Sequence, residues 1–260
     1  MSSQSAVLVT GASTGIGAVY AEHFARRGHD QVLVARHLER LTALAERLRG
    51  ETGVQVDILQ ADLTQDSDIT AVEQRLREDA QIGILINNAG TSIPGDFLNQ
   101  SSADITRLIT LNVTAVTRLA NAIAPRLTRA GAGAIVNIAS VVGLGPEMGL
   151  TVYGATKAFV LFLSQGLDVE LSAKGVYVQA VLPAATRTEI WQHSGKDVNA
   201  IPGVMEVEKL VDAALVGFDR RELVTIPPLQ DETQWQTLNA TRQAMLPAFV
   251  QSEPAARYLA

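Results

Sequence analysis

The sequence predicts an α/β fold, a doubly wound parallel sheet of about seven strands flanked by helices. Short β-branched apolar runs alternate along the chain with longer amphipathic stretches, which is the order of elements in such a fold. Most of these runs are apolar throughout, as strands covered on both faces are. The 260 residues are 47% hydrophobic, which is enough for one sizeable core, so we expect one domain over residues 1–260.

The apolar runs give the strands in order. They are residues 6–10, 31–35, 54–60, 82–87, 134–140, 177–183 and 222–226. Helical patterns lie between them; in residues 37–50 leucines recur at helical spacing, and Gly50 suits the end of that helix. Two prolines follow the last strand, and residues 228–260 are predicted to be a C-terminal extension whose helix ends near Pro247, followed by loop.

Composition narrows the classes of function. The formal net charge of −6 disfavours a nucleic-acid partner. The absence of cysteine excludes disulfides, thiolate metal sites and cysteine nucleophiles, and the four histidines fit no metal-ligand spacing. The N-terminus lacks the pattern of a signal peptide, and no run approaches the roughly 20 apolar residues of a membrane span. We therefore expect a cytoplasmic protein without a metal or a membrane partner.

The first strand leads into a glycine-rich turn and then a helix, in "VLVTGASTGIG" (7–17). Gly11, Gly15 and Gly17 allow the backbone to bend sharply and to approach a ligand closely. The N-terminus of the following helix suits a pyrophosphate. An ordinary strand–helix turn has a similar look, but the position after the first strand of a strand–helix–strand unit favours a dinucleotide site.

The end of the second strand bears on the choice of cofactor. A site for NAD usually has an acidic residue here, whereas a 2′-phosphate needs an arginine. Arg36 follows this strand with no acid beside it, which favours NADP(H) and leaves NAD(H) as the second choice. Ser13 and Thr14 could donate from the turn, and Arg40 lies one helical turn beyond Arg36. Alternatively, Arg36 only begins a solvated helix.

A tyrosine and a lysine stand four residues apart in "TVYGATKAF" (151–159). On a helix this spacing puts Tyr153 and Lys157 on one face. The charge of Lys157 is expected to lower the pKa of Tyr153, which could then exchange a proton with a carbonyl oxygen. Ser140 closes the fifth strand at the same edge of the sheet and could polarise that carbonyl. Taken singly, each of these residues also fits an ordinary structural role.

Together these features resemble the short-chain dehydrogenase/reductase family. "TGASTGIG" (10–17), "NNAG" (87–90), Asn112, Ser140 and the Tyr153–Lys157 pair occur in that family's order and at about its spacings. The resemblance covers roughly residues 5–226. It implies a Rossmann-like domain that binds a nicotinamide dinucleotide and moves a hydride between a ketone or aldehyde and an alcohol.

The resemblance also implies roles for further residues. Asn112 would hold a water that feeds protons towards Lys157. Asp62 would receive the adenine amino group and Leu63 would pack on the ring, although Asp62 also fits a helix cap. The remaining cofactor contacts that it implies are Ile16, Asn87, Ala89, Gly90, Pro183, Thr186 and Thr188. The sequence departs from the family at Ala184, where a glycine is usual.

Apolar segments indicate the substrate. Residues 189–205, with Ile190 and Trp191, are expected to form a lid, and Val142 lies in an apolar loop after Ser140. These contacts predict a small, mainly apolar carbonyl or alcohol substrate. Alternatively, they simply pack on the core.

The predicted function is an NADP(H)-dependent alcohol dehydrogenase or carbonyl reductase. One alternative is a 3-oxoacyl-thioester reductase, which would benefit from a basic patch, but only the scattered Arg126, Arg129 and Lys196 are present. The other is a non-catalytic dinucleotide sensor on the same fold, which need not keep a Ser–Tyr–Lys set.

Two long helical stretches, residues 100–129 and 152–173, bear on assembly. Residues 107–125 are apolar on more than one face, so this helix needs a second partner. The resemblance likewise implies paired helices across a two-fold axis. We expect a homodimer or homotetramer.

Overall fold

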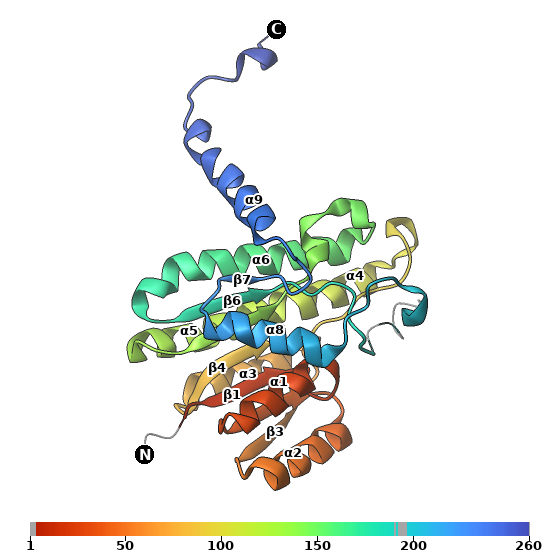
Figure 1. The fold of residues 1–260 in the computed structure, drawn as a ribbon, viewed down its shortest axis with the longest axis vertical. Coiled ribbons are helices and arrows are strands. Elements are labelled where there is room, and N and C mark those ends of the chain that lie inside the picture. The colour runs from red at the N-terminus through yellow and green to blue at the C-terminus, as the bar shows by residue number, and fades with distance from the viewer. Residues whose placement is uncertain (1–3, 190, 192–196, 260) are drawn as a thin grey trace. The chain divides into compact units, whose positions relative to one another are not determined.

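The computed structural model describes residues 4–189, 191 and 197–259. The chain divides into two compact units, Met1–Pro227 and Pro228–Ala260, which are described separately. The larger unit contains the whole sheet (Figure 1) and, within the described residues, every predicted site residue.

The larger unit is built on a seven-stranded sheet in the order β3-β2-β1-β4-β5-β6-β7. The strands are β1 (Ala6–Thr10), β2 (Gln31–Ala35), β3 (Val56–Gln60), β4 (Ile82–Asn87), β5 (Ala134–Ile138), β6 (Tyr177–Val181) and β7 (Val224–Thr225). Every neighbouring pair is parallel; Val9 of β1, for example, lies between Leu33 of β2 and Ile86 of β4. The chain runs outward from β1 to β3 and then crosses back to β4. The β1–β4 boundary is therefore the switch point of the sheet, beside which ligands bind in open α/β folds.

Helices connect the strands, as parallel pairing requires. They are α1 (Gly15–Arg26), α2 (Leu38–Thr52), α3 (Asp66–Glu78), α4 (Ser102–Ile109), α5 (Val116–Ala130), α6 (Thr151–Leu171) and α8 (Val207–Asp219). A π-helical segment, η2 (Thr110–Ala115), joins α4 directly to α5. The short 3₁₀ helices of this unit are η1 (Phe97–Asn99), η3 (Val141–Leu144), η4 (Pro146–Met148), η5 (Ser172–Lys174) and η6 (Val198–Ala200).

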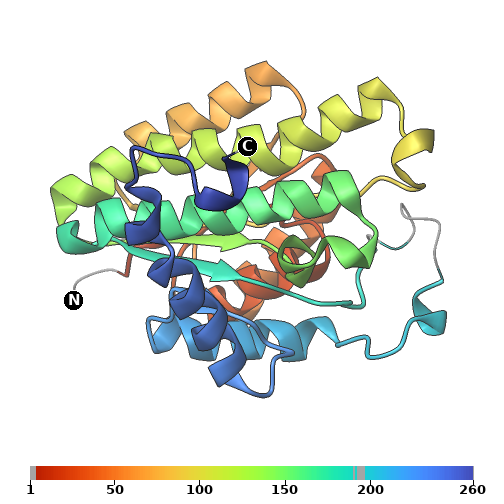
Figure 2. The same cartoon turned by 90° about the horizontal axis from the view of Figure 1, so that it is seen from above.

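The helices cover both faces of the sheet (Figures 1 and 2). Helices α1, α2 and α8 share one apolar cluster, in which Phe24, Leu44 and Val211 are buried. The other cluster includes Val72 of α3 and Ile123 of α5. Alternate residues of β1 enter opposite clusters, which confirms the prediction of strands buried on both faces.

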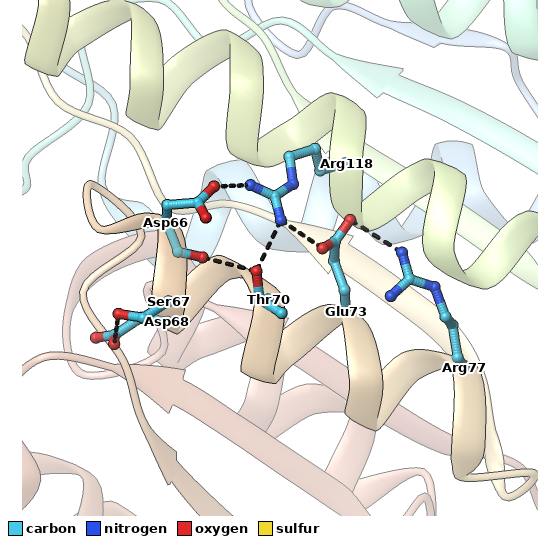
Figure 3. Close-up of polar contacts among 7 residues, drawn as sticks. All are labelled: Asp66, Ser67, Asp68, Thr70, Glu73, Arg77 and Arg118. Atoms are coloured by element: carbon cyan, nitrogen blue, oxygen red, sulfur yellow. Dashed lines mark hydrogen bonds and ion pairs between the residues drawn. The ribbon is translucent and has the colours of Figure 1, made fainter.

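An ion-pair network centred on the buried Glu73 joins α3 to α5 immediately after the π-helix (Figure 3). Glu73 of α3 is only 6% exposed, and its carboxylate accepts from Arg118 at 2.6 Å and from Arg77 at 3.1 Å. Arg118 also bonds Thr70 at 2.9 Å and pairs with Asp66. These bonds raise the pKa of Arg118, so the guanidinium stays charged and fixes the start of α5 against α3.

The smaller unit consists of α9 (Glu232–Ala244) and two short 3₁₀ helices, η7 (Leu246–Phe249) and η8 (Ala256–Tyr258). Asp231 caps α9 by accepting from the Thr233 amide and hydroxyl at 3.0 and 2.6 Å, and these bonds lower its pKa. The expected helix is present, and η8 lies where the sequence predicted loop.

The predicted fold class is confirmed, with small errors at the ends of elements. The strand at residues 82–87 has the predicted bounds, whereas β7 is two residues long instead of five because only Val224 and Thr225 pair with β6. The predicted single domain over residues 1–260 and the lid over 189–205 stay predictions. Across the described ranges, no helix is long and apolar enough to cross a membrane.

Candidate functional site

The glycine turn is fastened to the loop after β4. The Thr10 hydroxyl donates to the carbonyl of Ile86 at 3.2 Å and accepts from the amides of Asn88 and Ala89, each at 3.0 Å. The side-chain amide of Asn88 donates through Nδ2 to the carbonyls of Thr10 and Gly11 at 2.9 and 3.2 Å. "TGASTGIG" and "NNAG" therefore form one rigid loop pair at the switch point.

Glycine is required at two positions of this pair. Gly11 has a φ of +65°, and a Cβ there would lie 2.8 Å from Asn88 Nδ2. A Cβ on Gly17 would lie 2.4 Å from the carbonyl oxygen of Gly11. Any side chain at either residue would push the turn away from its partner loop, so the predicted need for glycine has a steric cause.

The first turn of α1 has the features of an anion site. Thr14 is the N-cap residue, but its side chain makes no capping bond, and the first turn carries no acidic residue. The N–H groups at this end, near Ile16, therefore keep their capacity to bind an anion, and the helix dipole favours one. A cavity of about 580 Å³ opens beside the turn, with Thr14, Gly15 and Thr188 in its lining. Ser13 lies half-buried in the same turn.

The end of β2 presents two arginines. Arg36 is exposed, and within the described residues no acidic side chain forms an ion pair with it. Arg40, at the start of α2, is paired with Glu189 at 2.7 Å. Within the described residues, Arg36 is thus available to bind a phosphate. Arg40, in contrast, is paired with the carboxylate of Glu189, which lies in the segment after β6.

Three predicted cofactor residues have their side chains committed elsewhere. The Asn87 amide lies in the core and donates to Asn137 Oδ1 at 3.0 Å, and Leu63 is 5% exposed within the α3–α5 cluster. Asp62 Oδ1 accepts from the Thr64 amide and hydroxyl at 3.0 and 2.9 Å and so forms a local turn, whereas the N-cap residue of α3 is Gln65 and not Asp62, as the alternative had expected. Contacts of Asn87 and Leu63 with a dinucleotide would have to use their main chains.

Tyr153, Lys157 and Ser140 come together where β5 meets α6. Lys157 is buried, its ammonium donates to the Ile138 carbonyl at 2.8 Å, and its Nζ lies 5.7 Å from the centroid of the Tyr153 ring. Ser140 donates to the Pro183 carbonyl at 3.1 Å and accepts from the Val142 amide at 3.3 Å. The predicted juxtaposition is therefore present at the carboxyl edge of the sheet.

Burial sets the ionisation of this pair. Desolvation raises the pKa of Tyr153 to about 12, against a smaller opposite effect of its hydrogen bond with Ser140. Desolvation also lowers the pKa of Lys157 to about 8. Burial therefore has the largest effect on the phenol of the chain by itself, and the prediction that Lys157 lowers the pKa of Tyr153 stays a prediction.

Asn112 lies in the π-helical segment η2, which interrupts the helix predicted over residues 100–129. Its Oδ1 accepts from the Thr91 amide at 3.1 Å, and its Nδ2 donates to the Thr91 carbonyl at 2.9 Å and to the Thr156 hydroxyl at 3.1 Å. A Cβ on Gly90 would lie 3.4 Å from both Asn112 Oδ1 and Lys157 Nζ. Asn112 and Lys157 therefore border one small space above Gly90, as the implied proton route requires.

The segment after β6 returns over the glycine turn. The Pro183 carbonyl accepts from the Val141 amide at 3.0 Å, and the Thr188 methyl would lie 3.3 Å from a Cβ on Gly15. Thr186 is buried and its carbonyl accepts from the Trp191 indole at 2.6 Å. The Arg187 amide donates to the Met205 carbonyl and the Met205 amide donates to the Ala185 carbonyl, each at 2.9 Å, and these two main-chain bonds close the base of the segment. Ala184 is accommodated here, with its carbonyl accepting from the Thr186 hydroxyl at 3.0 Å.

Two of the predicted substrate contacts can be placed. Val142 packs on α6, where a Cβ on Gly154 would lie 3.3 Å from its Cγ1, and Trp191 is half-buried. Ile190 lies outside the described residues. The part of the chain that the structure describes holds no group of three or more His, Asp or Glu side chains placed to bind a metal.

Three polar residues at the site were not predicted from the sequence. They are Asn88, Thr91 and Thr156, which bind the glycine turn, Asn112 and the Tyr153 carbonyl. Asn88 stood inside the quoted "NNAG" pattern and Thr156 inside "TVYGATKAF", so position in a motif was the available signal. Their partners, however, come from distant parts of the chain and have no sequence pattern of their own.

Solved structures of other proteins resemble the whole chain. A short-chain dehydrogenase from Sphingobium yanoikuyae, in complex with NADPH, is 65% identical, with a TM-score of 0.97 over 98% of this chain and 100% of that one. A bulky-bulky ketone specific alcohol dehydrogenase from Comamonas testosteroni is 57% identical, with a TM-score of 0.93 over 100% of both chains.

Curated relatives match a shorter region. The very-long-chain 3-oxoacyl-CoA reductase-B of Danio rerio is 37% identical over 187 residues, which are 70% of this chain and 60% of that protein. The human 17-beta-hydroxysteroid dehydrogenase type 3 is 36% identical over 194 residues, 74% of this chain and 62% of that protein. The match thus spans about three fifths of the length of these relatives. The family model for short chain dehydrogenases matches residues 5–199, and with the site described above this establishes that the chain belongs to the short-chain dehydrogenase family.

Proposed function

We propose that this protein is an NADP(H)-dependent oxidoreductase that interconverts a ketone or aldehyde with an alcohol. The observation that carries the proposal is the convergence of Ser140, Tyr153, Lys157 and Asn112 at the carboxyl edge, next to an uncapped helix N-terminus. A non-catalytic sensor would have no use for this set. The solved structures that resemble the whole chain include an NADPH complex and an alcohol dehydrogenase, which supports the same function.

The residues present fit a nicotinamide dinucleotide. The first turn of α1 offers N–H groups to a pyrophosphate, Gly11 and Gly17 let the turn lie close to its neighbours, and Arg36 offers a guanidinium to a 2′-phosphate. The bound cofactor would supply or accept the hydride. This arrangement favours NADP(H), and NAD(H) stays the second choice.

The chain's own residues would handle the proton. Ser140 orients and polarises the carbonyl, and Tyr153 donates its phenolic proton to the carbonyl oxygen during reduction. Lys157, which has a depressed pKa of about 8, can pass a replacement proton in the working pH range. Asn112 borders the same space as Lys157 and completes the route by which protons return. In alcohol oxidation each transfer runs in reverse.

The proposed substrate has large apolar groups on both sides of its carbonyl. Large apolar side chains are exposed on the segments that follow β4 and β5, at the same end of the sheet as the site (Figure 1). They are Phe97 at 58%, Leu98 at 90%, Leu144 at 38% and Met148 at 53%. Exposed apolar surfaces of this kind mark places where an apolar ligand can bind and cover them. The ketone specificity named for the Comamonas enzyme is consistent with such a ligand. Residues 189–205 are proposed to cover the substrate as a lid.

A 3-oxoacyl-thioester substrate is the second candidate, because the matching curated relatives include 3-oxoacyl-CoA reductases. An acyl carrier or coenzyme A would call for basic side chains at the mouth of the site. Arg126 instead donates to the carbonyls of Leu76 and Ile82, at the amino edge of the sheet, opposite the site. Arg129 ends the same helix, and Lys196 lies outside the described residues. A ketone with apolar groups on both sides of its carbonyl therefore ranks first.

The test is a panel of ketones that vary in size on each side of the carbonyl, assayed with NADPH and NADH by nicotinamide absorbance. We expect NADPH-dependent reduction that improves as both substituents become larger and apolar. A free 3-oxoacyl thioester in the same panel tests the second candidate. NADPH binding without turnover of any carbonyl would support the sensor reading instead. The homo-oligomer and the cytoplasmic location stay proposals.

A further inference from the structure

We propose that Thr156 is a positioning residue that couples Asn112 to the Tyr153–Lys157 face of α6 through a single hydroxyl group. This inference rests on the proposed function, and it concerns a buried residue to which the proposed chemistry gives no direct part. Thr156 is 3% exposed and lies between the two proton-handling residues of α6 and the π-helical segment η2.

The Thr156 hydroxyl makes two hydrogen bonds, one as donor and one as acceptor. It donates its one proton to the Tyr153 carbonyl at 2.7 Å, and it accepts from Asn112 Nδ2 at 3.1 Å. Because its proton is committed to Tyr153, the oxygen can act only as an acceptor towards Asn112. The Asn112 amide must therefore present its nitrogen to α6.

Thr91 fixes the same orientation from the other side. The Thr91 amide donates to Asn112 Oδ1 at 3.1 Å, and the Thr91 carbonyl accepts from Nδ2 at 2.9 Å. If the Asn112 amide were flipped, Oδ1 would face the Thr91 carbonyl and the Thr156 hydroxyl oxygen, and the NH₂ would face the Thr91 N–H. These three partners therefore specify one orientation of the amide. In this arrangement Oδ1 borders the space that it shares with Lys157 Nζ above Gly90.

The π-helix explains why such fixing is needed. A π-turn inside an α-helix changes the hydrogen-bond register of the backbone and is frequent at functional sites, so contacts with neighbouring elements decide how its side chains are placed. On one side, Arg118 anchors the start of α5 to Asp66, Thr70 and Glu73 of α3 (Figure 3). On the side of α6, the Thr156 hydroxyl accepts a hydrogen bond from Asn112 Nδ2. Without that bond, Asn112 is tied to Thr91 alone and can turn away from Lys157.

Two matched pairs of variants separate the hydroxyl from simple packing. Thr156→Val keeps the shape and removes the hydroxyl, whereas Thr156→Ser keeps the hydroxyl and loses the methyl. We expect Thr156→Val to lower kcat by about 10- to 100-fold, since displacing a reacting group by about 1 Å costs up to about 100-fold. The KM for NADPH should stay near the wild-type value, and Thr156→Ser should stay close to wild type. If Thr156→Val does not fold, Thr156→Ala against Thr156→Ser makes the same comparison.

The pH profile and a control distinguish positioning from stability. The pH dependence of kcat should shift in Thr156→Val, because the proton route through Asn112 and Lys157 is disturbed. Thr128→Val is the control, since the Thr128 hydroxyl makes a similar bond at 3.0 Å to the carbonyl three residues earlier, at the far end of α5. It should leave both kcat and its pH profile unchanged.

A measurement without turnover keeps the inference separate from the proposed function. Hydrogen exchange, followed by mass spectrometry on the NADPH-loaded protein, should become faster at residues 110–115 in Thr156→Val and not in Thr156→Ser. A Thr156→Val variant with wild-type kcat, pH profile and exchange overturns the inference, as does activity that follows side-chain size instead of the hydroxyl. A wild type that binds NADPH and reduces no carbonyl contradicts the proposed function instead, and the exchange result still decides the coupling.

Discussion

At the scale of single residues, Tyr153 carries the largest share of the proposed chemistry. Tyr153→Phe keeps the ring on α6 and removes only the transferable proton. We expect turnover to fall by about 10²–10⁴-fold, the usual contribution of a general acid or base, while NADPH binding persists. The measurement is ketone reduction beside a fluorescence titration with NADPH.

Tyr20→Phe is the matched control for this substitution. Within the described residues the Tyr20 hydroxyl is buried without a hydrogen-bond partner, so its removal should leave turnover unchanged. Wild-type turnover in Tyr153→Phe would mean that the proton comes from another group.

The raised pKa of Tyr153 leads to a second prediction at this scale. Burial raises it to about 12, from 10.0 for an ordinary tyrosine, so the free enzyme should keep the phenol protonated beyond pH 10. Oxidised nicotinamide carries a positive charge, which favours the phenolate and should lower the pKa. The phenolate absorbance of wild type minus Tyr153→Phe, titrated with and without NADP⁺, should appear at lower pH with the cofactor. Identical titrations would refute the idea that the cofactor tunes this acid.

The sequence carried the identities of the reactive residues but not their ionisation. The spacing of Tyr153 and Lys157 was enough to place them together, because a helix fixes which residues share a face. The pKa of Tyr153 depends on how much water the fold removes from the phenol, and that is a property of packing around it. The hydrogen bond between Asn112 and Thr156 joins residues 44 apart in the sequence, and no local sequence pattern predicts such a contact.

At the scale of elements, the ion pair between Arg40 of α2 and Glu189 beyond β6 bears on cofactor choice. Glu189 holds a guanidinium that lies one helical turn from Arg36, where we propose that the 2′-phosphate binds. Glu189→Gln should free Arg40 and remove a repelling charge, so NADPH should bind about two- to fivefold more tightly, the range expected for an exposed pair. NADH, which lacks the phosphate, should gain nothing. Fluorescence titrations with both cofactors measure the difference.

The matched control for this pair is Glu206→Gln. Glu206 pairs with Arg187 at 2.9 Å in the same segment, is similarly exposed, and is paired with neither Arg36 nor Arg40. It should change the affinities for the two cofactors equally or not at all. An equal gain for NADPH and NADH in Glu189→Gln would show that the pair acts on the loop and not on the phosphate.

Secondary-structure elements differ in how well the sequence predicts them. The strand at residues 82–87 was predicted correctly because an apolar run ended at a polar motif. The π-helix at Asn112 was not predicted, since the amphipathic pattern continues unbroken through residues 100–129 while the backbone changes its hydrogen bonding. Such a local change is decided by the contacts with Thr91, Thr156 and α3, which form only in the folded chain.

At the scale of the whole molecule, the proposed assembly rests on α6, which corresponds to the second of the two helical stretches that the sequence indicated, residues 152–173. The apolar residues of 107–125 are largely covered within the chain; Leu119 and Ile123 are buried against α3 and the sheet. Within residues 107–125 Ile109 is exposed, at 42%, whereas α6 exposes three large apolar side chains, Phe159, Phe162 and Val169, at 39%, 75% and 82%. Burial of α5 by α3 could not be read from the amphipathic pattern of one helix.

The exposed residues of α6 form one stripe that a second copy of the chain could cover. Phe159, Phe162, Gly166 and Val169 are spaced three and four residues apart and so share a face. A Cβ on Gly166 would meet nothing within 4 Å, so the middle of the stripe is open to a partner. Phe162→Glu should put a charge in the centre of a two-fold contact and reduce the mass measured by light scattering towards the monomer. Leu38→Glu, on α2 where the leucine is 48% exposed, should not change the mass. A wild type that is a monomer at micromolar concentration would contradict the proposed assembly. A Phe162→Glu variant that keeps the wild-type oligomeric mass would show that the contact lies on another surface.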